Sequence, residues 1–253
     1  MDATVPLKII KVSDNGADRV DDIVASERRL RIKVNGVEII KLFCTPVMIR
    51  ELVVGFFMTE GLIKGGFCAE RMSIEYGEEI VIDIPAEGEV SLEGSTITSG
   101  CVGGVTFDHS EVGIEVRNDL RISKNQLKDL FTKFQKASRL YNQTGCIHSA
   151  AVSDGKEIIV LAEDIGRHNA VDKAIGYCIL ENIGLDDKIM LVSGRLSSEM
   201  ASKCSRWAIP IVASRTAPTE RAVMLARKRG ITMIGFMRGT RFNIYSGPER
   251  IVF

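Results

Sequence analysis

Three short runs of almost entirely apolar residues place the strongest limit on how this chain can fold. The runs are Ile189–Val192, Ile211–Ala213 and Thr232–Phe236. Each run is shorter than an ordinary helix, and such runs are typical of strands that helices cover on both faces. Amphipathic patterns at residues 168–182, 197–208 and 218–229 predict the covering helices. The second half of the chain is therefore predicted to be an α/β fold, a three-layer sandwich.

A capping box and a hairpin precede these elements. Ser123 and Gln126 have the spacing of a capping box, and the apolar periodicity that follows predicts a helix to about Tyr141. The apolar segments on both sides of Asp154-Gly155 predict a β-hairpin, because this dipeptide favours a tight turn. We expect a domain of residues 121–253 that begins with this helix.

The first 120 residues are predicted to form a smaller, strand-rich α+β domain. Apolar segments on both sides of Asn35-Gly36 predict a second hairpin. Thr45 as a cap and Pro46 at the first helical position predict a helix, which is expected to end at Gly61. Further strands are expected at residues 80–84 and 95–98.

Charge and hydropathy exclude two classes of partner. Lys plus Arg and Asp plus Glu number 33 each, so the chain has no net basic charge that would favour nucleic acid. No apolar run approaches the roughly 20 residues of a membrane-spanning helix, and the first residues lack the pattern of a secretory signal. We therefore expect a cytoplasmic protein that binds neither nucleic acid nor membrane.

An arginine follows the end of each of four predicted strands. These arginines are Arg167, Arg195, Arg215 and Arg238. Ligands bind at the carboxyl ends of strands in open α/β sheets, and guanidinium groups there suit a polyanion such as a nucleotide or dinucleotide. Small and polar neighbours complete the predicted site, namely His168, Asn169, Ser193, Gly194 and Ser214. The alternative is that the arginines are solvated surface charges.

Three further polar residues near these strand ends have more than one interpretation. Glu163 and Asp164 could read a sugar or a base edge, or could pair with Arg167. His168 could contact an anion or could cap a helix. Cys146 and His148 lie close together but do not form a tetrahedral ligand set, so we expect no zinc or other metal.

One of the six cysteines, Cys101, lies in the glycine-rich stretch TSGCVGGV at residues 98–105. Free cysteine usually packs as a small apolar residue, and Cys178 and Cys204 fall on the apolar faces of predicted helices. The glycines around Cys101 allow either a mobile arm that presents a reactive thiolate or a simple turn of the chain. No histidine or lysine lies next to Cys101 to favour its thiolate form.

Four segments of the chain match one known pattern. The segments are EDIGRHNAVDK at 163–173, SGRLSSEM at 193–200, GFMRG at 235–239 and FFMTEG at 56–61. Together they resemble the FdhD family, the sulfurtransferases that serve formate dehydrogenase. The resemblance covers most of the chain from about residue 30 onward.

The resemblance implies a carrier that takes persulfide sulfur from a cysteine desulfurase. The sulfur would pass to the molybdenum of Mo-bis(molybdopterin guanine dinucleotide), and this cofactor would then enter formate dehydrogenase; a guanine nucleotide is a partial mimic of it. The family's sulfur-carrying cysteine corresponds to Cys101. Its cofactor-binding stretch corresponds to Phe236, Met237, Arg238, Gly239, Thr240 and Arg241. A homodimer and a second domain similar to the cytidine deaminase fold are also implied.

The glycine loop departs from the family's pattern. The family usually has two cysteines spaced C-x-x-C, whereas Gly104 stands at the second place here. One thiolate can still accept and release a sulfur by attack at sulfur, so transfer through Cys101 remains chemically open. The alternative is a protein that binds and delivers the nucleotide cofactor without sulfur transfer. A zinc deaminase is disfavoured, because His148 is followed by Ser149 and Ala150 and residues 214–218 contain no cysteine.

Overall fold

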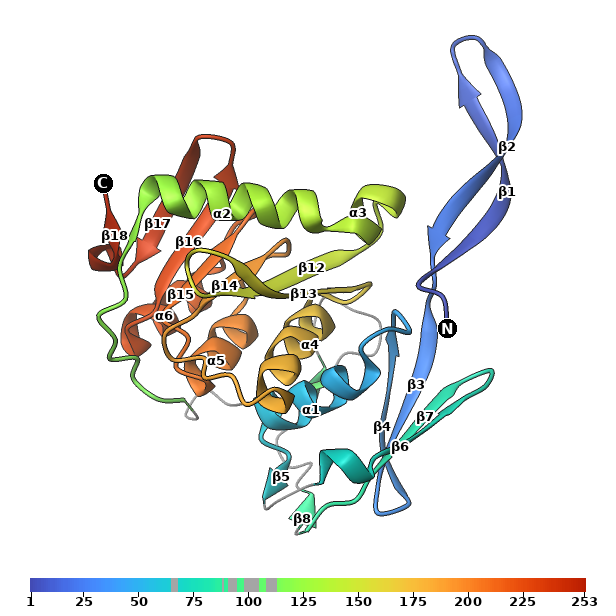
Figure 1. Ribbon diagram of the computed structural model, residues 1–253, viewed down its shortest axis with the longest axis horizontal. Coiled ribbons are helices and arrows are strands. Elements are labelled where there is room, and N and C mark those ends of the chain that lie inside the picture. The colour runs from blue at the N-terminus through green and yellow to red at the C-terminus, as the bar shows by residue number, and fades with distance from the viewer. Residues whose placement is uncertain (65–67, 88, 91–94, 98–104, 108–112) are drawn as a thin grey trace.

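A six-stranded sheet forms the centre of the computed structural model, which is a mixed α/β protein (Figure 1). Its strands are β12 (His148–Ser153), β13 (Ile158–Asp164), β14 (Ile189–Val192), β15 (Ile211–Ser214), β16 (Thr232–Arg238) and β17 (Arg241–Ser246). Their order across the sheet is β13-β12-β14-β15-β16-β17. β14, β15 and β16 are parallel, and the other neighbours are antiparallel. The three apolar strands and the hairpin predicted from the sequence are confirmed.

The structure describes the chain except residues 65–67, 88, 91–94, 98–104 and 108–112. Cys101 and Gly104 lie outside the described residues, so the roles predicted for the glycine loop stay predictions.

Helices cover both faces of the six-stranded sheet, as the three-layer prediction requires. They are α2 (Lys124–Ala137), α4 (Arg167–Leu180), α5 (Ser198–Arg206) and α6 (Glu220–Arg229). α2 packs on one face, where its apolar side chains join Ala151, Leu191 and Ala213 in one core cluster. The other three helices pack on the opposite face, around Val152 and Val192. The likeness to the cytidine deaminase fold stays a prediction.

The predicted continuous helix from residue 124 to Tyr141 is wrong, because it is broken at Ser138. The capping box at its start is confirmed, since the Ser123 hydroxyl accepts a hydrogen bond from the backbone N–H of Gln126. α2 ends at Ala137, and a short helix, α3 (Arg139–Thr144), follows. The Glu163 carboxylate accepts hydrogen bonds from the N–H groups of residues 140 and 141. This carboxylate from another strand supplies the cap that starts α3.

A four-stranded sheet forms the core of the first half. Its strands are β3 (Arg28–Val34), β4 (Val37–Cys44), β6 (Ser73–Tyr76) and β7 (Ile80–Ile84), in the order β4-β3-β7-β6. Asn35 and Gly36 have φ values of 50° and 80° in the turn between β3 and β4, which confirms the predicted hairpin. Helix α1 (Ile49–Glu60) covers this sheet, and Leu52 packs against Ile32 and Ile82 in one cluster.

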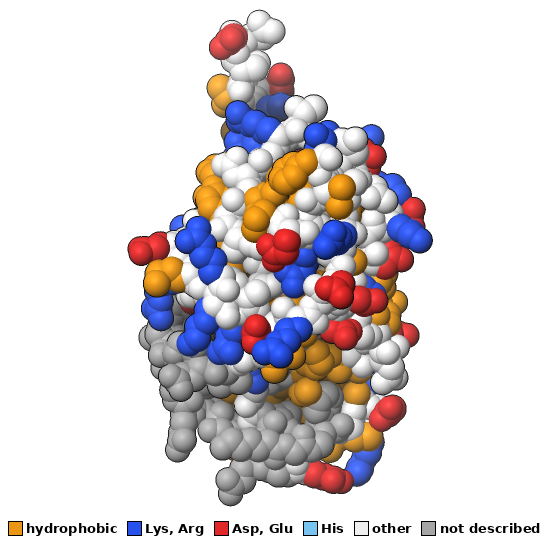
Figure 2. All heavy atoms as spheres, turned by 90° about the vertical axis from the view of Figure 1, so that its left-hand side faces the viewer, with side chains coloured by type: hydrophobic (Ala, Val, Ile, Leu, Met, Phe, Trp, Pro, Cys, Tyr) orange, Lys and Arg blue, Asp and Glu red, His pale blue; other side chains and the backbone are white. Residues whose placement is uncertain are grey.

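The remaining elements complete the described chain. They are β1 (Thr4–Ser13), β2 (Gly16–Ala25), β5 (Ile63–Lys64), β8 (Glu89–Val90), β9 (Ser95–Ile97), β10 (Val105–Phe107), β11 (Ile122–Ser123) and β18 (Ile251–Val252), with 3-10 turns at Ala69–Arg71 and Pro248–Arg250. On the face shown in Figure 2, basic and acidic side chains are interspersed. Among the described residues, no helix is both long and apolar enough to cross a membrane. The cytoplasmic location stays a prediction.

The start of α1 differs from the prediction. Thr45 and Pro46 do not begin the helix; α1 begins at Ile49, after Met48 in the left-handed region with φ 53°. The predicted end is confirmed, because Gly61 has φ 65° and its N–H donates to the Phe57 carbonyl. The Thr45 hydroxyl instead accepts a hydrogen bond from the N–H of residue 165, 120 positions along the chain. Thr45 therefore ties the two halves together.

α1 and α4 touch backbone to backbone. A Cβ atom added at Gly55 would lie 1.8 Å from the carbonyl oxygen of Asp172, and one added at Gly176 would lie 1.9 Å from that of Glu51. Only glycine allows so close an approach at these two positions. The contact joins the strand-rich half to the six-stranded sheet; the domain division between residues 120 and 121 stays a prediction.

A buried charge cluster lies beside this helix contact. The Lys203 ammonium is 2.7 Å from a carboxylate oxygen of both Asp172 and Glu60, and 2.7 Å from the Thr59 hydroxyl. Burial alone would lower the pKa of Lys203, but the negative charges of Asp172 and Glu60 outweigh burial and raise that pKa, so the lysine stays charged. Removing one partner from such a buried pair costs about 3–5 kcal/mol. The cluster therefore fixes α1, α4 and α5 in one arrangement.

We predict that Gly55→Ala destabilises the fold by about 3 kcal/mol, because the added methyl group must push the α1 and α4 backbones apart. Urea unfolding followed by circular dichroism measures this change. Gly77→Ala is the matched control, since a Cβ at Gly77 meets only the Glu79 carbonyl at an ordinary 3.6 Å. We expect the control to change stability by less than about 0.5 kcal/mol. Equal unfolding midpoints for the two variants would contradict the close helix contact.

Candidate functional site

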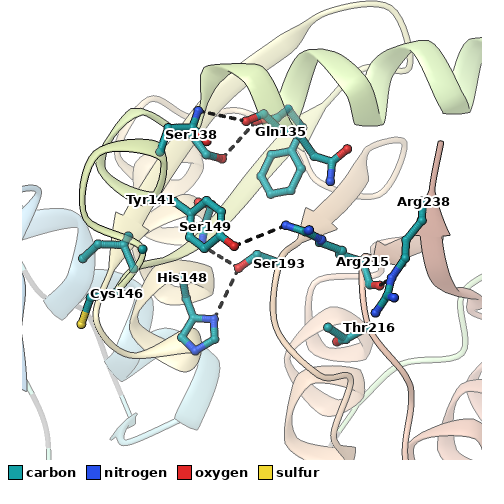
Figure 3. A pocket seen from close by; sticks show the side chains of 14 residues that line it. Gln135, Ser138, Tyr141, Cys146, His148, Ser149, Ser193, Arg215, Thr216 and Arg238 are labelled. Atoms are coloured by element: carbon teal, nitrogen blue, oxygen red, sulfur yellow. Dashed lines mark hydrogen bonds between the residues drawn. The ribbon is translucent and has the colours of Figure 1, made fainter. Parts of the chain in front are cut away.

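A cavity of about 490 Å³ opens at the carboxyl ends of β14, β15 and β16 (Figure 3). Tyr141 and Asn142 of α3 lie on one wall. Ser193, Arg215 and Arg238, from the segments at the strand ends, lie on the other. This volume falls within the usual range for small-molecule sites. The cavity therefore occupies the edge at which the sequence predicted a ligand.

Two of the four predicted arginines line the cavity. A guanidinium nitrogen of Arg215 donates to the Tyr141 hydroxyl at 3.4 Å (Figure 3). Nε of Arg238 donates to the backbone carbonyl of Arg215, also at 3.4 Å. A guanidinium group has five N–H donors, so each of these side chains keeps donors for a ligand. The wall that holds Arg215 and Arg238 is thus suited to phosphate or carboxylate groups.

His148 and Ser193 form a second polar corner of the cavity. The Ser193 hydroxyl accepts a hydrogen bond from the N–H of Ser149 at 2.9 Å and lies 3.4 Å from Nδ1 of His148. Burial lowers the pKa of His148, and the positive charge of Arg167 lowers it further. The imidazole is therefore neutral at neutral pH and can serve as both donor and acceptor.

Arg167 lies against this corner. A Cβ added at Gly194 would come within 3.0 Å of the Cβ of Arg167 and 3.4 Å of Nδ1 of His148. Any larger residue at position 194 would crowd these side chains, so glycine suits the close approach of the start of α4 to the end of β14. The predicted residues Arg167, Ser193 and Gly194 are brought together, whereas Arg195 is exposed and does not line the cavity.

Glu163 and Asp164 do not line the cavity. Both are buried, and Glu163 caps α3 as described above. The Asp164 carboxylate accepts hydrogen bonds from the N–H groups of Thr45 and Gly166, and it pairs with the buried ammonium of Lys173 at 2.6 Å. The predicted reading of a sugar or base edge by these two acids is corrected to a structural role. They hold the walls of the cavity.

Several other side chains that were predicted to contact a ligand form hydrogen bonds with other groups of the protein instead. Ser214 is fully buried and donates to the Gly194 carbonyl at 2.6 Å. The Asn169 amide donates to the Phe43 carbonyl, which is part of β4. His168 is buried with Nε2 3.0 Å from a Glu199 oxygen, and this hydrogen bond holds the pKa of Glu199 below its usual value. These three side chains do not line the cavity; their hydrogen bonds hold the segments around it in place.

The predicted stretch from Phe236 to Arg241 divides into exposed and buried residues. Met237 is buried in the core, so its side chain offers no surface to a ligand. Phe236 has φ 53°, is 36% exposed and lies with the Cζ atom of Arg238 6.0 Å from its ring centre. A register shift between Gly235 and Arg238 accompanies this strained backbone. Gly239, Thr240 and Arg241 are exposed beyond it.

The residues that the sequence analysis missed come mainly from α2 and α3. Gln135, Tyr141 and Asn142 line the cavity, as does Thr216 after β15. No local pattern marks these residues, because the break at Ser138 that turns α3 toward the cavity depends on the distant Glu163. Cys146 also lines the cavity, but its sulfur points away from the arginines (Figure 3).

Comparison with known proteins identifies what the chain resembles. A Listeria innocua protein named Sulfur carrier protein FdhD is 33% identical over 99% of this chain and 100% of its own length. A Staphylococcus aureus protein of the same name is 34% identical over 99% of this chain and 97% of its own length. The crystal structure of a formate dehydrogenase accessory protein from Desulfotalea psychrophila matches with a TM-score of 0.80 and 28% identity, over 99% and 100% of the two chains. The FdhD/NarQ family profile matches residues 25–252, and the chain belongs to the FdhD/NarQ family.

Proposed function

We propose that this chain is a sulfur carrier that passes persulfide sulfur from a cysteine desulfurase to the molybdenum of Mo-bis(molybdopterin guanine dinucleotide). The sulfurated cofactor, which is the cargo, would then enter formate dehydrogenase. One observation carries the proposal: this chain, which belongs to the FdhD/NarQ family, has a cavity at the carboxyl ends of its parallel strands, and Arg215 and Arg238 line that cavity. The names of its relatives, sulfur carrier protein and formate dehydrogenase accessory protein, support it.

The cavity suits one guanosine diphosphate unit of the cofactor. Arg215 and Arg238 would bind the pyrophosphate, because guanidinium groups form paired, charge-assisted hydrogen bonds with phosphate oxygens. Gln135 and Asn142 on the opposite wall offer amide donors and acceptors to a base or a sugar. The neutral imidazole of His148, beside Ser193, also lines the cavity and can donate or accept a hydrogen bond with the ligand.

Cys101 is the proposed sulfur-bearing residue. Its thiolate would attack the terminal sulfur of the desulfurase persulfide; a new S–S bond forms at Cys101 as the old one breaks, and the desulfurase cysteine leaves as a thiolate. Two other cysteines are unsuited to this step, because burial raises the pKa of Cys204 to about 12 and that of Cys178 to about 11. Their thiols stay protonated at neutral pH.

The glycine at position 104, where the family usually has a second cysteine, favours a second candidate function that involves no sulfur transfer. Release of the terminal sulfur as sulfide needs two electrons, which a second thiol supplies as it forms a disulfide with the first. The glycine at position 104 cannot supply that thiol, so a small-molecule thiol would have to do so. The alternative function is binding and delivery of the nucleotide cofactor without sulfur transfer.

We predict that Arg215→Met and Arg238→Met each weaken the binding of guanosine diphosphate by about 10- to 100-fold, the cost of losing a charge-assisted hydrogen bond. Isothermal titration calorimetry measures the affinities. Arg121→Met is the control, because Arg121 is exposed and lies before α2, at the end of that helix far from the cavity. A nucleotide that binds both cavity variants as tightly as the control would place the nucleotide site elsewhere.

We predict that guanosine diphosphate raises the pKa of His148, which burial lowers in the free protein. The bound phosphates add negative charge near the imidazole and so favour its protonated form. Because binding then takes up a proton, affinity should rise as the pH falls through the range between the free and bound pKa values. NMR titration of the ring protons, assigned with His148→Gln, measures both pKa values. An unchanged pKa on saturation would separate His148 from the phosphates.

We predict that incubation with a cysteine desulfurase and cysteine adds the mass of one sulfur atom to the chain, and that Cys101→Ala abolishes the gain. Intact-protein mass spectrometry under non-reducing conditions detects the adduct. Cys146→Ala is the control, since Cys146 is an exposed thiol among the described residues. No added sulfur on the unmodified sequence, together with tight nucleotide binding, would support the delivery function in place of sulfur transfer.

A further inference from the structure

Acidic and basic residues are spread unevenly along the chain, although their totals are equal. Residues 1–120 contain 12 Lys or Arg and 21 Asp or Glu, whereas residues 121–253 contain 21 Lys or Arg and 12 Asp or Glu. The first half therefore has a net charge of −9 and the second half a net charge of +9. Because salt screens exposed charges beyond about 10 Å, a partner meets the charge of the half that it approaches. The second half is thus suited to an anionic partner.

Helix α2 presents basic side chains on its outer side. Its apolar residues, among them Leu127 and Phe134, are buried against the six-stranded sheet, so its polar residues face away from that sheet (Figure 1). Four basic residues at the surface follow this outer side into the start of α3, namely Lys124, Lys128, Lys136 and Arg139. We call these four residues the basic α2 face.

Few acids neutralise the basic α2 face. Asp129 is the one acidic residue between residues 124 and 139. The fifth base of this stretch, Lys133, is already paired with Glu157 at 2.7 Å. Asp154, in the same turn as Glu157, accepts the N–H groups of residues 156 and 157. Among the residues that the structure describes, no carboxylate forms an ion pair with a member of the face.

The basic α2 face leads to the mouth of the cavity. Gln135, the residue before Lys136, lines the cavity, and so does Ser138, the residue before Arg139. The four basic residues themselves do not line it, so their charges stay available to a partner outside. Charges beside a site raise the rate at which an oppositely charged partner finds it. A protein bound along α2 would therefore lie next to a ligand held in the cavity.

We propose that the basic α2 face docks an acidic surface of the protein that receives the cofactor. The inference rests on the proposed function, because the recipient must approach the mouth of the cavity that would hold the nucleotide. A membrane surface fits less well, since an interfacial helix needs a free apolar side and that of α2 is buried in the core. The acidic half of a second copy fits less well too, because contacts between unlike halves are heterologous and add copies without closing.

Binding of the purified full chain to cofactor-free formate dehydrogenase, followed by biolayer interferometry, tests the proposal. We expect the double variant Lys124→Glu with Lys128→Glu to bind at least about tenfold more weakly than the natural sequence, mainly through slower association. The matched control is Arg221→Glu with Lys228→Glu, which makes the same change in net charge on α6, on the opposite face of the sheet. Circular dichroism checks that both double variants stay folded. Equal binding by the two double variants would overturn the proposal.

Calorimetry with guanosine diphosphate separates the docking surface from the function on which it rests. The double variant at Lys124 and Lys128 should bind the nucleotide as tightly as the natural sequence, because neither residue lines the cavity. A chain that binds the dehydrogenase through the basic α2 face but binds no nucleotide would reject the cavity assignment and support the docking surface. Tight nucleotide binding, with dehydrogenase binding that ignores the charge reversal, would reject the docking surface alone.

Vesicles of phosphatidylglycerol distinguish an acidic protein from an anionic membrane as the occupant of the basic α2 face. We expect the natural sequence to stay in the supernatant when the vesicles are sedimented, because α2 has no free apolar side. Vesicle binding by the natural sequence that is lost in the Lys124→Glu, Lys128→Glu double variant would assign the face to a membrane and overturn the proposal.

Discussion

The backbone contact between α1 and α4 is the constraint on which the rest of the structure depends. Gly55 and Gly176 let the two helices approach until carbonyl oxygens occupy the space of a side chain. This distance brings the segment before α1 against the loop before α4, where the Thr45 hydroxyl receives the N–H of residue 165. That loop leads into Arg167, which lies against Gly194 beside the His148 corner of the cavity. The position of a site residue in the second half is thus set by packing from the first half.

The buried carboxylate of Asp164 links the segment before α1 to the start of α4, next to the cavity. One oxygen of its carboxylate accepts the N–H of Gly166 and the amide of Asn169; the other accepts the N–H of Thr45 and pairs with Lys173. A buried charge is costly unless every lone pair has a partner, and here the partners come from two segments far apart in the sequence, the one at Thr45 and the one that starts α4. The network therefore specifies one arrangement of these segments, because a displaced segment would leave a buried charge unpaired.

The sequence was sufficient to predict the features set by local physical chemistry, but not those set by distant contacts. The strand Ile189–Val192 and the cap at Ser123 were predictable because apolar runs and capping boxes act over a few residues. Thr45 looked like a helix cap, yet its hydroxyl is used by a residue 120 positions away. The arginines at the strand ends were predictable from topology, whereas Tyr141 reaches the cavity only because Glu163 restarts the helix.

The same contacts explain how a chain with equal numbers of acidic and basic residues maintains a cationic cavity. Three acids lie close to the site in the sequence or the fold, and each has internal partners: Glu163 with the start of α3, Asp164 with Lys173, and Glu199 with His168. Among the described residues, none of these carboxylates forms an ion pair with Arg215 or Arg238. Because carboxylates that already satisfy backbone N–H groups and buried cations have few lone pairs to offer, the two guanidinium groups keep their donors for an anion. The positive character of the cavity therefore arises from where the acids are placed and not from an excess of basic residues.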